Sequence, residues 1–188
     1  MSWHPTGRSL AYGEQNSGSR WDIMILPLEG DEASGWKPGK PTIFVVNGSG
    51  AAFSPDGRWL AYNSNESGRV EVYVRPFKGS GEKTQVSTAG GIYPTWSRNG
   101  KELFYQQSSD WTLMVATYAT EGDSFRVEKR QQLAGRLPRR GMGMPGFDLH
   151  PDGQRFAVLK AAEEPTEVKQ NQVVLIPRFI DELRRIAR

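Results

Sequence analysis

The sequence predicts an all-β fold, and three observations support this prediction. The chain holds 21 glycines and 12 prolines among 188 residues, about 18% where roughly 12% is usual, so it turns often. One five-residue turn motif recurs four times. Between turns, apolar and polar residues alternate: across 70–75 the valines face one way, and Glu71, Tyr73 and Arg75 face the other.

The recurring turn combines residues that favour a tight reversal. Proline pre-sets φ, Asp or Asn bonds its own backbone, and glycine adopts a left-handed conformation without Cβ strain. Repeats of strands about every 40–50 residues are typical of β-propeller blades. The four copies are Trp3-His4-Pro5-Thr6-Gly7, Phe53-Ser54-Pro55-Asp56-Gly57, Trp96-Ser97-Arg98-Asn99-Gly100 and Leu149-His150-Pro151-Asp152-Gly153.

Each turn leads into a set of predicted strands, so the prediction is a β-propeller of four blade repeats, a partial or half propeller. The 188 residues form a single domain in this interpretation. Strands are expected at 8–12, 21–28 and 42–46, at 58–62, 70–77 and 83–87, at 101–105, 112–119 and 125–133, and at 154–158 and 172–179. The predicted blades span about 1–47, 48–90, 91–140 and 141–178.

A short C-terminal helix is expected at 179–188. Phe179, Leu183 and Ile186 follow i, i+4, i+7 spacing, which gives the segment one apolar face. That face either caps the propeller's own edge or flank, or docks a partner.

Composition excludes several classes of function. The absence of cysteine removes disulfides, cysteine nucleophiles and thiolate metal sites, and two histidines cannot form a His-rich metal cluster. No apolar run approaches the ~18 residues of a membrane span. A net charge of +3 is too small to indicate nucleic-acid binding. The N-terminus has neither the charged nor the apolar region of a signal peptide.

Several segments resemble a known family. The string at 53–62, Phe-Ser-Pro-Asp-Gly-Arg-Trp-Leu-Ala-Tyr, resembles the TolB-like, WD40-like β-propeller repeat of bacteria. The runs at 72–77, 85–91 and 94–105 are similar to the C-terminal propeller of bacterial receptor-type serine/threonine kinases. The run at 147–156 resembles the last blade of that group, and 173–175 with 181–183 its terminal segment.

The resemblance implies a binding or scaffolding propeller, and it implies a periplasmic or extracytoplasmic location within a longer protein. No kinase signature occurs in this chain. Family propellers have more than four blades, so the chain resembles the C-terminal part of a longer one. Three closures stay open: two copies that form an eight-bladed ring, a four-bladed ring, or an open arc.

The sequence offers few residues that could carry out catalysis. His4 and His150 occupy a turn position that Ser54 and Ser97 fill in the other copies, which favours a structural role. Asp148 corresponds to Ser2, Ala52 and Thr95, so only one copy in four offers a carboxylate at this position, which is poor for Ca²⁺. We expect neither a metal nor a cofactor. The sequence therefore favours a non-enzymatic role, with a lactonase- or esterase-type propeller hydrolase as the alternative.

The best candidate site is the mouth of the central channel. Glycine-rich segments at 47–50, 90–93 and 141–146 enter the inner strands, and such loops commonly meet a ligand. The alternative is that they only make the tight crossing between blades. A protein or small-molecule ligand and a homo-oligomer that completes the propeller are the expected partners. The expected ligand-binding residues are Tyr93, Arg139, Arg140, Met142, Met144 and Asp148.

Overall fold

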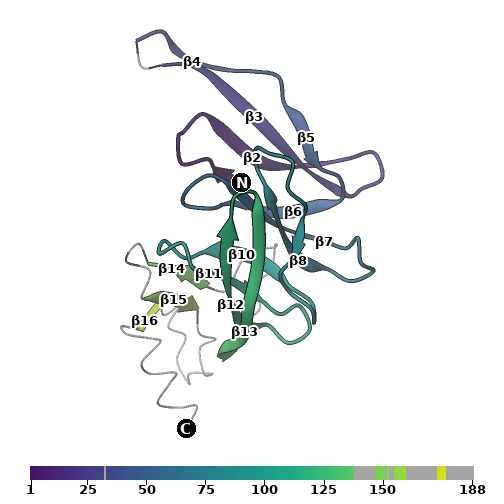
Figure 1. Cartoon of the computed structure of the whole chain (residues 1–188), viewed down its shortest axis with the longest axis vertical. Coiled ribbons are helices and arrows are strands. Elements are labelled where there is room, and N and C mark those ends of the chain that lie inside the picture. Colours follow the sequence, from purple (N-terminus) through teal and green to yellow (C-terminus); the bar gives the residue numbers. More distant parts are fainter. Residues whose placement is uncertain (32, 138–146, 151, 153–154, 160–172, 177–188) are drawn as a thin grey trace, which may run out of the picture.

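A computed structural model describes residues 1–31, 33–137, 147–150, 152, 155–159 and 173–176. These residues are all-β and form four antiparallel sheets in succession, which is the architecture of a partial β-propeller (Figure 1). The expected helix at 179–188 lies outside the described residues. Within the described part, no helix is long and apolar enough to cross a membrane.

Each sheet is a meander whose strands follow one another along the chain. The first sheet is β1 (Ser2–Trp3), β2 (Ser9–Gln15), β3 (Trp21–Asp31) and β5 (Thr42–Val45), with β4 (Gly35–Pro38) paired to the far end of β3. The second is β6 (Gly48–Phe53), β7 (Trp59–Ser64), β8 (Glu71–Pro76) and β9 (Thr84–Gln85). The third is β10 (Ile92–Trp96), β11 (Glu102–Gln106), β12 (Thr112–Glu121) and β13 (Ser124–Arg136). The fourth is β14 (Phe147–Leu149), β15 (Phe156–Leu159) and β16 (Val173–Ile176).

The recurring turn has one geometry in the first three copies. The glycine N–H donates to the carbonyl three residues earlier, from Gly7 to His4, Gly57 to Ser54 and Gly100 to Ser97. All three glycines have φ near +70° (71°, 71° and 67°), a conformation in which a Cβ is strained. The side chain before each glycine accepts the N–H that follows the turn, as in Asp56 with Arg58 and Asn99 with Lys101. The turn chemistry expected from the sequence is confirmed at these three positions.

Apolar clusters fill the spaces between successive sheets. At the first interface, small and β-branched side chains of one sheet meet larger side chains of the next. Ala11 and Ile23 of the first sheet pack with Leu60 and Tyr62 of the second, and all four are nearly inaccessible to solvent. The second and third sheets share a cluster around Val72, Trp96 and Leu103, and the third and fourth share one around Phe104 and Phe156. Sheet-to-sheet burial of this kind is the main stabilising contribution to the fold.

Tyrosine side chains are part of these interfaces. Burial raises the pKa of Tyr62 to about 12, and nearby Glu66 acts in the same direction. Burial also raises the pKa of Tyr118 to about 12, with a smaller contribution from Asp56. Both hydroxyls are neutral near pH 7, the form that burial favours.

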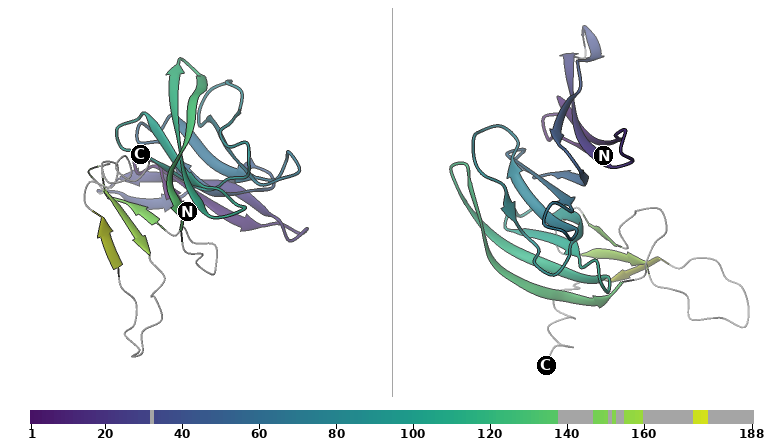
Figure 2. Two further views of the ribbon diagram at one scale, coloured as in Figure 1. Left: turned by 90° about the horizontal axis from the view of Figure 1, so that it is seen from below. Right: turned by 90° about the vertical axis from the view of Figure 1, so that its right-hand side faces the viewer.

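The structure also holds an element that the sequence did not indicate. β3 continues beyond the first sheet and turns back as β4, so a two-stranded hairpin projects from the end of the molecule (Figure 1). Arg8 lies over the Trp36 ring at 5.7 Å, which connects the hairpin to the turn after β1. In the right-hand view of Figure 2 the first sheet, in purple, stands at one end of the stack.

Two turn glycines of identical φ offer a matched test of the packing between the first two sheets. A Cβ at Gly57 would lie 2.4 Å from Nε2 of His4, whereas a Cβ at Gly7 would meet no atom within 4 Å. Gly7→Ala should cost about 1–2 kcal/mol in unfolding free energy, from the left-handed backbone alone. Gly57→Ala should cost roughly 1–3 kcal/mol more, because the methyl group displaces the His4 ring.

Urea unfolding of both variants measures this difference. In a His4→Ala background, Gly57→Ala should lower the unfolding free energy by no more than Gly7→Ala does, because the His4 ring is no longer there to be displaced. Equal costs in the wild-type background would contradict the contact between His4 and the second turn.

Candidate functional site

The inner strands of the four sheets line one open cavity of about 940 Å³. Strand pairing places Ser2, Ala52, Thr95 and Asp148 at the same register position, opposite Ala11, Ala61, Phe104 and Ala157. All four equivalent residues line the cavity. The correspondence expected from the repeat is therefore confirmed, and Asp148 is its one carboxylate. The Asp148 side chain is exposed.

Hydrogen bonds between neighbouring inner strands hold the wall of this cavity together. The hydroxyl Oγ of Ser2 in β1 accepts the Phe53 N–H of β6 at 3.0 Å. The indole Nε1 of Trp96 in β10 donates to the Ala52 carbonyl of β6 at 2.9 Å. The first three inner strands are thus connected side by side, and the residues that face the cavity are fixed relative to one another.

Tyr93 lines the cavity from an unusual backbone conformation. It has φ of +56° and sits at a bulge in β10 between Ile92 and Thr95. The matching bulge in β6 holds Gly50, with φ of +66°. A tyrosine in this region is strained, and the following Pro94 restricts its backbone further. Strain of this kind persists where the surrounding structure enforces it and gathers at functional sites.

Arg98 is a cavity residue that the sequence interpretation missed. It stands at the turn position held by Pro5 and Pro55 in the first two copies, and all three line the cavity. The sequence could have indicated this residue, because Arg98 replaces the proline of the repeated turn motif. Arg98 is exposed and adds a cation to a wall that also carries Tyr93 and Asp148.

Of the expected ligand-binding residues, the structure brings Tyr93 and Asp148 to the same cavity. Arg139, Arg140, Met142 and Met144 lie outside the described residues. His4 makes structural contacts: its Nε2 donates to the Gly57 carbonyl at 3.1 Å, its Nδ1 accepts the Thr6 N–H, and its ring packs edge-on against Phe53. Among the described residues, no group of three or more His, Asp or Glu side chains could hold a metal ion.

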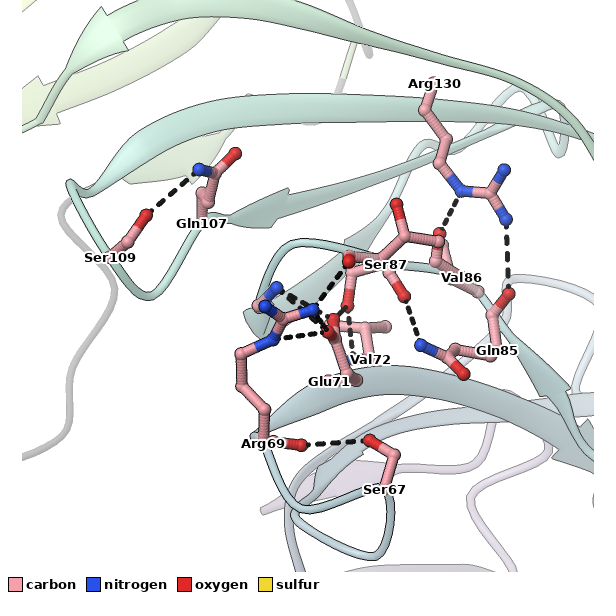
Figure 3. Close-up of polar contacts among 12 residues, drawn as sticks. Ser67, Arg69, Glu71, Val72, Gln85, Val86, Ser87, Gln107, Ser109 and Arg130 are labelled. Atoms are coloured by element: carbon pink, nitrogen blue, oxygen red, sulfur yellow. Dashed lines mark hydrogen bonds and ion pairs between the residues drawn. The ribbon is translucent and has the colours of Figure 1, made fainter.

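A buried carboxylate positions each of two crossings into the inner strands. Glu71, at the start of β8 and 1% exposed, accepts the Gly90 N–H at 3.0 Å and the Ser87 hydroxyl, and pairs with Arg69 at 2.7 Å (Figure 3). Asp22 accepts the Asn47 N–H at 2.9 Å just before β6. Asp22 and Glu71 occupy the same register position. In both sheets, a carboxylate at this position therefore accepts a backbone N–H of the crossing that leads to the next inner strand.

A further side chain ties the third sheet to the second near this carboxylate. Arg130 of β13 donates through Nε to the Val86 carbonyl at 2.5 Å, and its Nη2 lies 3.4 Å from the Gln85 carbonyl (Figure 3). These bonds fix the outer strands of the two sheets, while Glu71 fixes the crossing that leads to Tyr93.

Comparisons place this geometry in the class of TolB-like β-propellers at the level of fold. No protein-family model matches the chain. Over 169 residues it is 28% identical to an uncharacterized protein of Agrobacterium fabrum, a match that covers 84% of this chain and 53% of the relative. The chain therefore spans about half the length of the curated relative that it matches.

Two solved structures share the fold. TolB from Acinetobacter baumannii matches with a TM-score of 0.56 and 18% identity, over 94% of this chain and 42% of that one. A candidate 6-phosphogluconolactonase from Bacteroides uniformis matches with a TM-score of 0.56 and 16% identity, over 94% and 54%. One of these names describes an enzyme and the other does not, so the fold alone leaves both kinds of function open.

Removing the Glu71 carboxylate tests its role in the crossing. Glu71→Ala leaves the Gly90 N–H and the Ser87 hydroxyl without their acceptor and should lower the unfolding free energy by about 2–4 kcal/mol. Thr112 holds the same register position in the third sheet, so Thr112→Ala is the matched control and should cost less than about 1.5 kcal/mol. Thermal and urea unfolding measure both, and equal losses would argue against a special role for the carboxylate.

Proposed function

We propose that the chain is a non-catalytic binding or scaffolding module that takes a protein segment or a small molecule in the inner-strand cavity. The observation that carries the proposal is Tyr93, held at φ of +56° in a cavity-lining strand where the preceding sheet uses Gly50. If only the bulge mattered, a glycine would form it without strain. We infer that the strained tyrosine is kept for its side chain. A rigid aromatic ring is a common anchor for a bound partner.

The cavity has the size and chemistry for such a ligand. About 940 Å³ is at the upper end of the range for small-molecule sites, which suits an extended peptide segment or an oligosaccharide. Tyr93 provides an aromatic surface, Arg98 a cation and Asp148 an anion. Polar groups of both signs beside an aromatic ring fit a ligand that carries hydrogen-bonding groups as well as an apolar part.

The proposal has two further components that concern the whole protein. One is that the working form is a homo-oligomer that completes the propeller. The other follows from the resemblance to the C-terminal propeller of receptor-type kinases: the chain serves as the ligand-sensing part of a longer, receptor-like protein.

A propeller hydrolase of the lactonase or esterase type is the second candidate, favoured by the exposed Asp148 carboxylate in the cavity. A broad lactone and ester screen with and without Ca²⁺ tests it. Under the binding proposal the screen gives no turnover. Turnover that disappears in Asp148→Ala would overturn the binding proposal in favour of the hydrolase.

Tyr93→Gly separates binding from stability. The change relieves backbone strain of roughly 1–3 kcal/mol, which stabilises the fold, and it loses the contacts of the ring, which destabilises it. The two effects offset each other, so the unfolding free energy should stay within about 1 kcal/mol of the wild type. Binding of hits from a panel of short peptides and oligosaccharides should weaken at least about tenfold, because an aromatic anchor is lost. Calorimetric titration measures the affinity.

Trp36→Gly is the matched control, because Trp36 is an exposed aromatic residue on β4 outside the cavity. It should leave the affinity unchanged. A panel without any binder, or binders that are insensitive to Tyr93→Gly, would contradict the proposed site.

A further inference from the structure

The first sheet has an apolar outer face on the side opposite the second sheet. We define this outer face as Trp3, Leu10, Tyr12 and Met24. Trp3 pairs with Leu10 and Tyr12 pairs with Met24, and paired residues of an antiparallel sheet point to the same side. Trp3 is 56% exposed, and the other three are half-buried.

The same four register positions are covered in the next sheet. There they are Phe53, Leu60, Tyr62 and Tyr73, which are 7%, 0%, 2% and 3% exposed beneath the first sheet. The third sheet repeats the pattern with Trp96, Leu103 and Tyr105, which are at most 6% exposed beneath the second sheet. The fourth repeats it with Phe156 and Val158, which pack beneath the third. This pattern is therefore the side of a sheet that a preceding sheet covers.

We propose that a second copy of this chain covers the outer face with its fourth sheet. In the first two sheets, the side that covers the next sheet carries an alanine at the centre of the inner edge, Ala11 and Ala61. The fourth sheet holds Ala157 at this register position, which leaves room for the large side chains of an outer face. Ala157 is half-buried, and among the described residues no apolar cluster joins the fourth sheet to the first.

The lengths of the related chains favour a second copy as the occupant. This chain covers 53% of its curated relative and 42% and 54% of the two solved propellers. Two copies therefore supply about as much chain as one of those proteins. Each copy offers one outer face and one fourth sheet, so a two-fold axis satisfies both copies at once and closes the ring. The inference rests on the homo-oligomer component of the proposed function and is independent of the cavity ligand.

The repeat also specifies a hydrogen bond at the new contact. Within the chain, Trp96 Nε1 donates to the carbonyl of Ala52 in the preceding inner strand. By register, Trp3 corresponds to Trp96, and Asp148 corresponds to Ala52. The Trp3 indole should therefore donate to the backbone carbonyl of Asp148 in the second copy, which places the cavity-lining strands of the two copies side by side.

Light scattering of the 188-residue chain across a wide concentration range tests the proposal. The expected mass is twice 21.0 kDa, falling toward 21.0 kDa on dilution. Trp3→Lys should weaken dimerisation roughly 30-fold or more, because it places an unpaired charge in a contact with a large aromatic anchor. Trp3→Phe keeps a smaller aromatic ring but loses the N–H, so it should weaken dimerisation by about 3- to 10-fold.

Trp21→Lys is the matched control, since Trp21 is 51% exposed and lies on the side of β3 that holds Ile23, opposite the outer face. It should dimerise like the wild type. Circular dichroism and thermal unfolding check that each variant keeps the fold. A single 21.0 kDa species at every concentration would overturn both this inference and the homo-oligomer component of the proposed function. A dimer that persists unchanged in Trp3→Lys would overturn the assignment of the outer face alone.

Discussion

The packing of each sheet's apolar side chains beneath the preceding sheet is the interaction on which the rest of the structure depends. Leu60 lies against Ala11 and Ile23, and Leu103 lies in the same way against Val72. A one-residue slip of any strand would turn these side chains to the other face. The requirement for interface packing therefore fixes the strand register, and the register in turn decides which residues reach the cavity.

The inner strands impose a second constraint, because they leave one sheet and enter the next through tight crossings. A backbone N–H in such a crossing has no ladder partner and needs an acceptor. Asp22 and Glu71 supply that acceptor for Asn47 and Gly90, from the same position in two sheets. Burying a carboxylate is costly, so it is retained where several donors converge on it. These carboxylates are part of the scaffold, whereas Asp148 stands exposed in the cavity.

The sequence was sufficient to predict the features that depend on neighbouring residues along the chain. The turn at 53–57 and the alternation across 70–75 identify strands and their faces, and the repeat aligns Asp148 with Ser2. The left-handed backbone of Tyr93 could not be predicted, because its β10 bulge depends on pairing with β11 and nothing in Tyr-Pro favours a positive φ.

Long-range contacts account for another feature that the sequence did not predict. Glu71 reads as an ordinary outward residue of an alternating strand, and only the folded crossing brings Gly90 and Ser87 to it.

The β3–β4 hairpin matches the far end of the β12–β13 hairpin by register, since Asp31 pairs with Gly35 as Glu121 pairs with Ser124. The sequence predicted the strand near 125–133 but none at 35–38, because the two segments share no repeated motif.

The cavity and the uncovered outer face are related through the ends of the stack. Ser2 in the first sheet and Asp148 in the fourth line the same cavity, although no apolar cluster joins those two sheets among the described residues. The cavity wall is therefore held together by three sheet interfaces and stays open where a fourth would lie. A neighbour that covers Trp3 would also bring another inner strand beside Ser2, because Trp3 and Ser2 are consecutive residues of β1. Closure of the ring by the proposed second copy would therefore also change the shape of the cavity, and a ligand that contacts the first inner strand would bind the single and the assembled chain with different affinities.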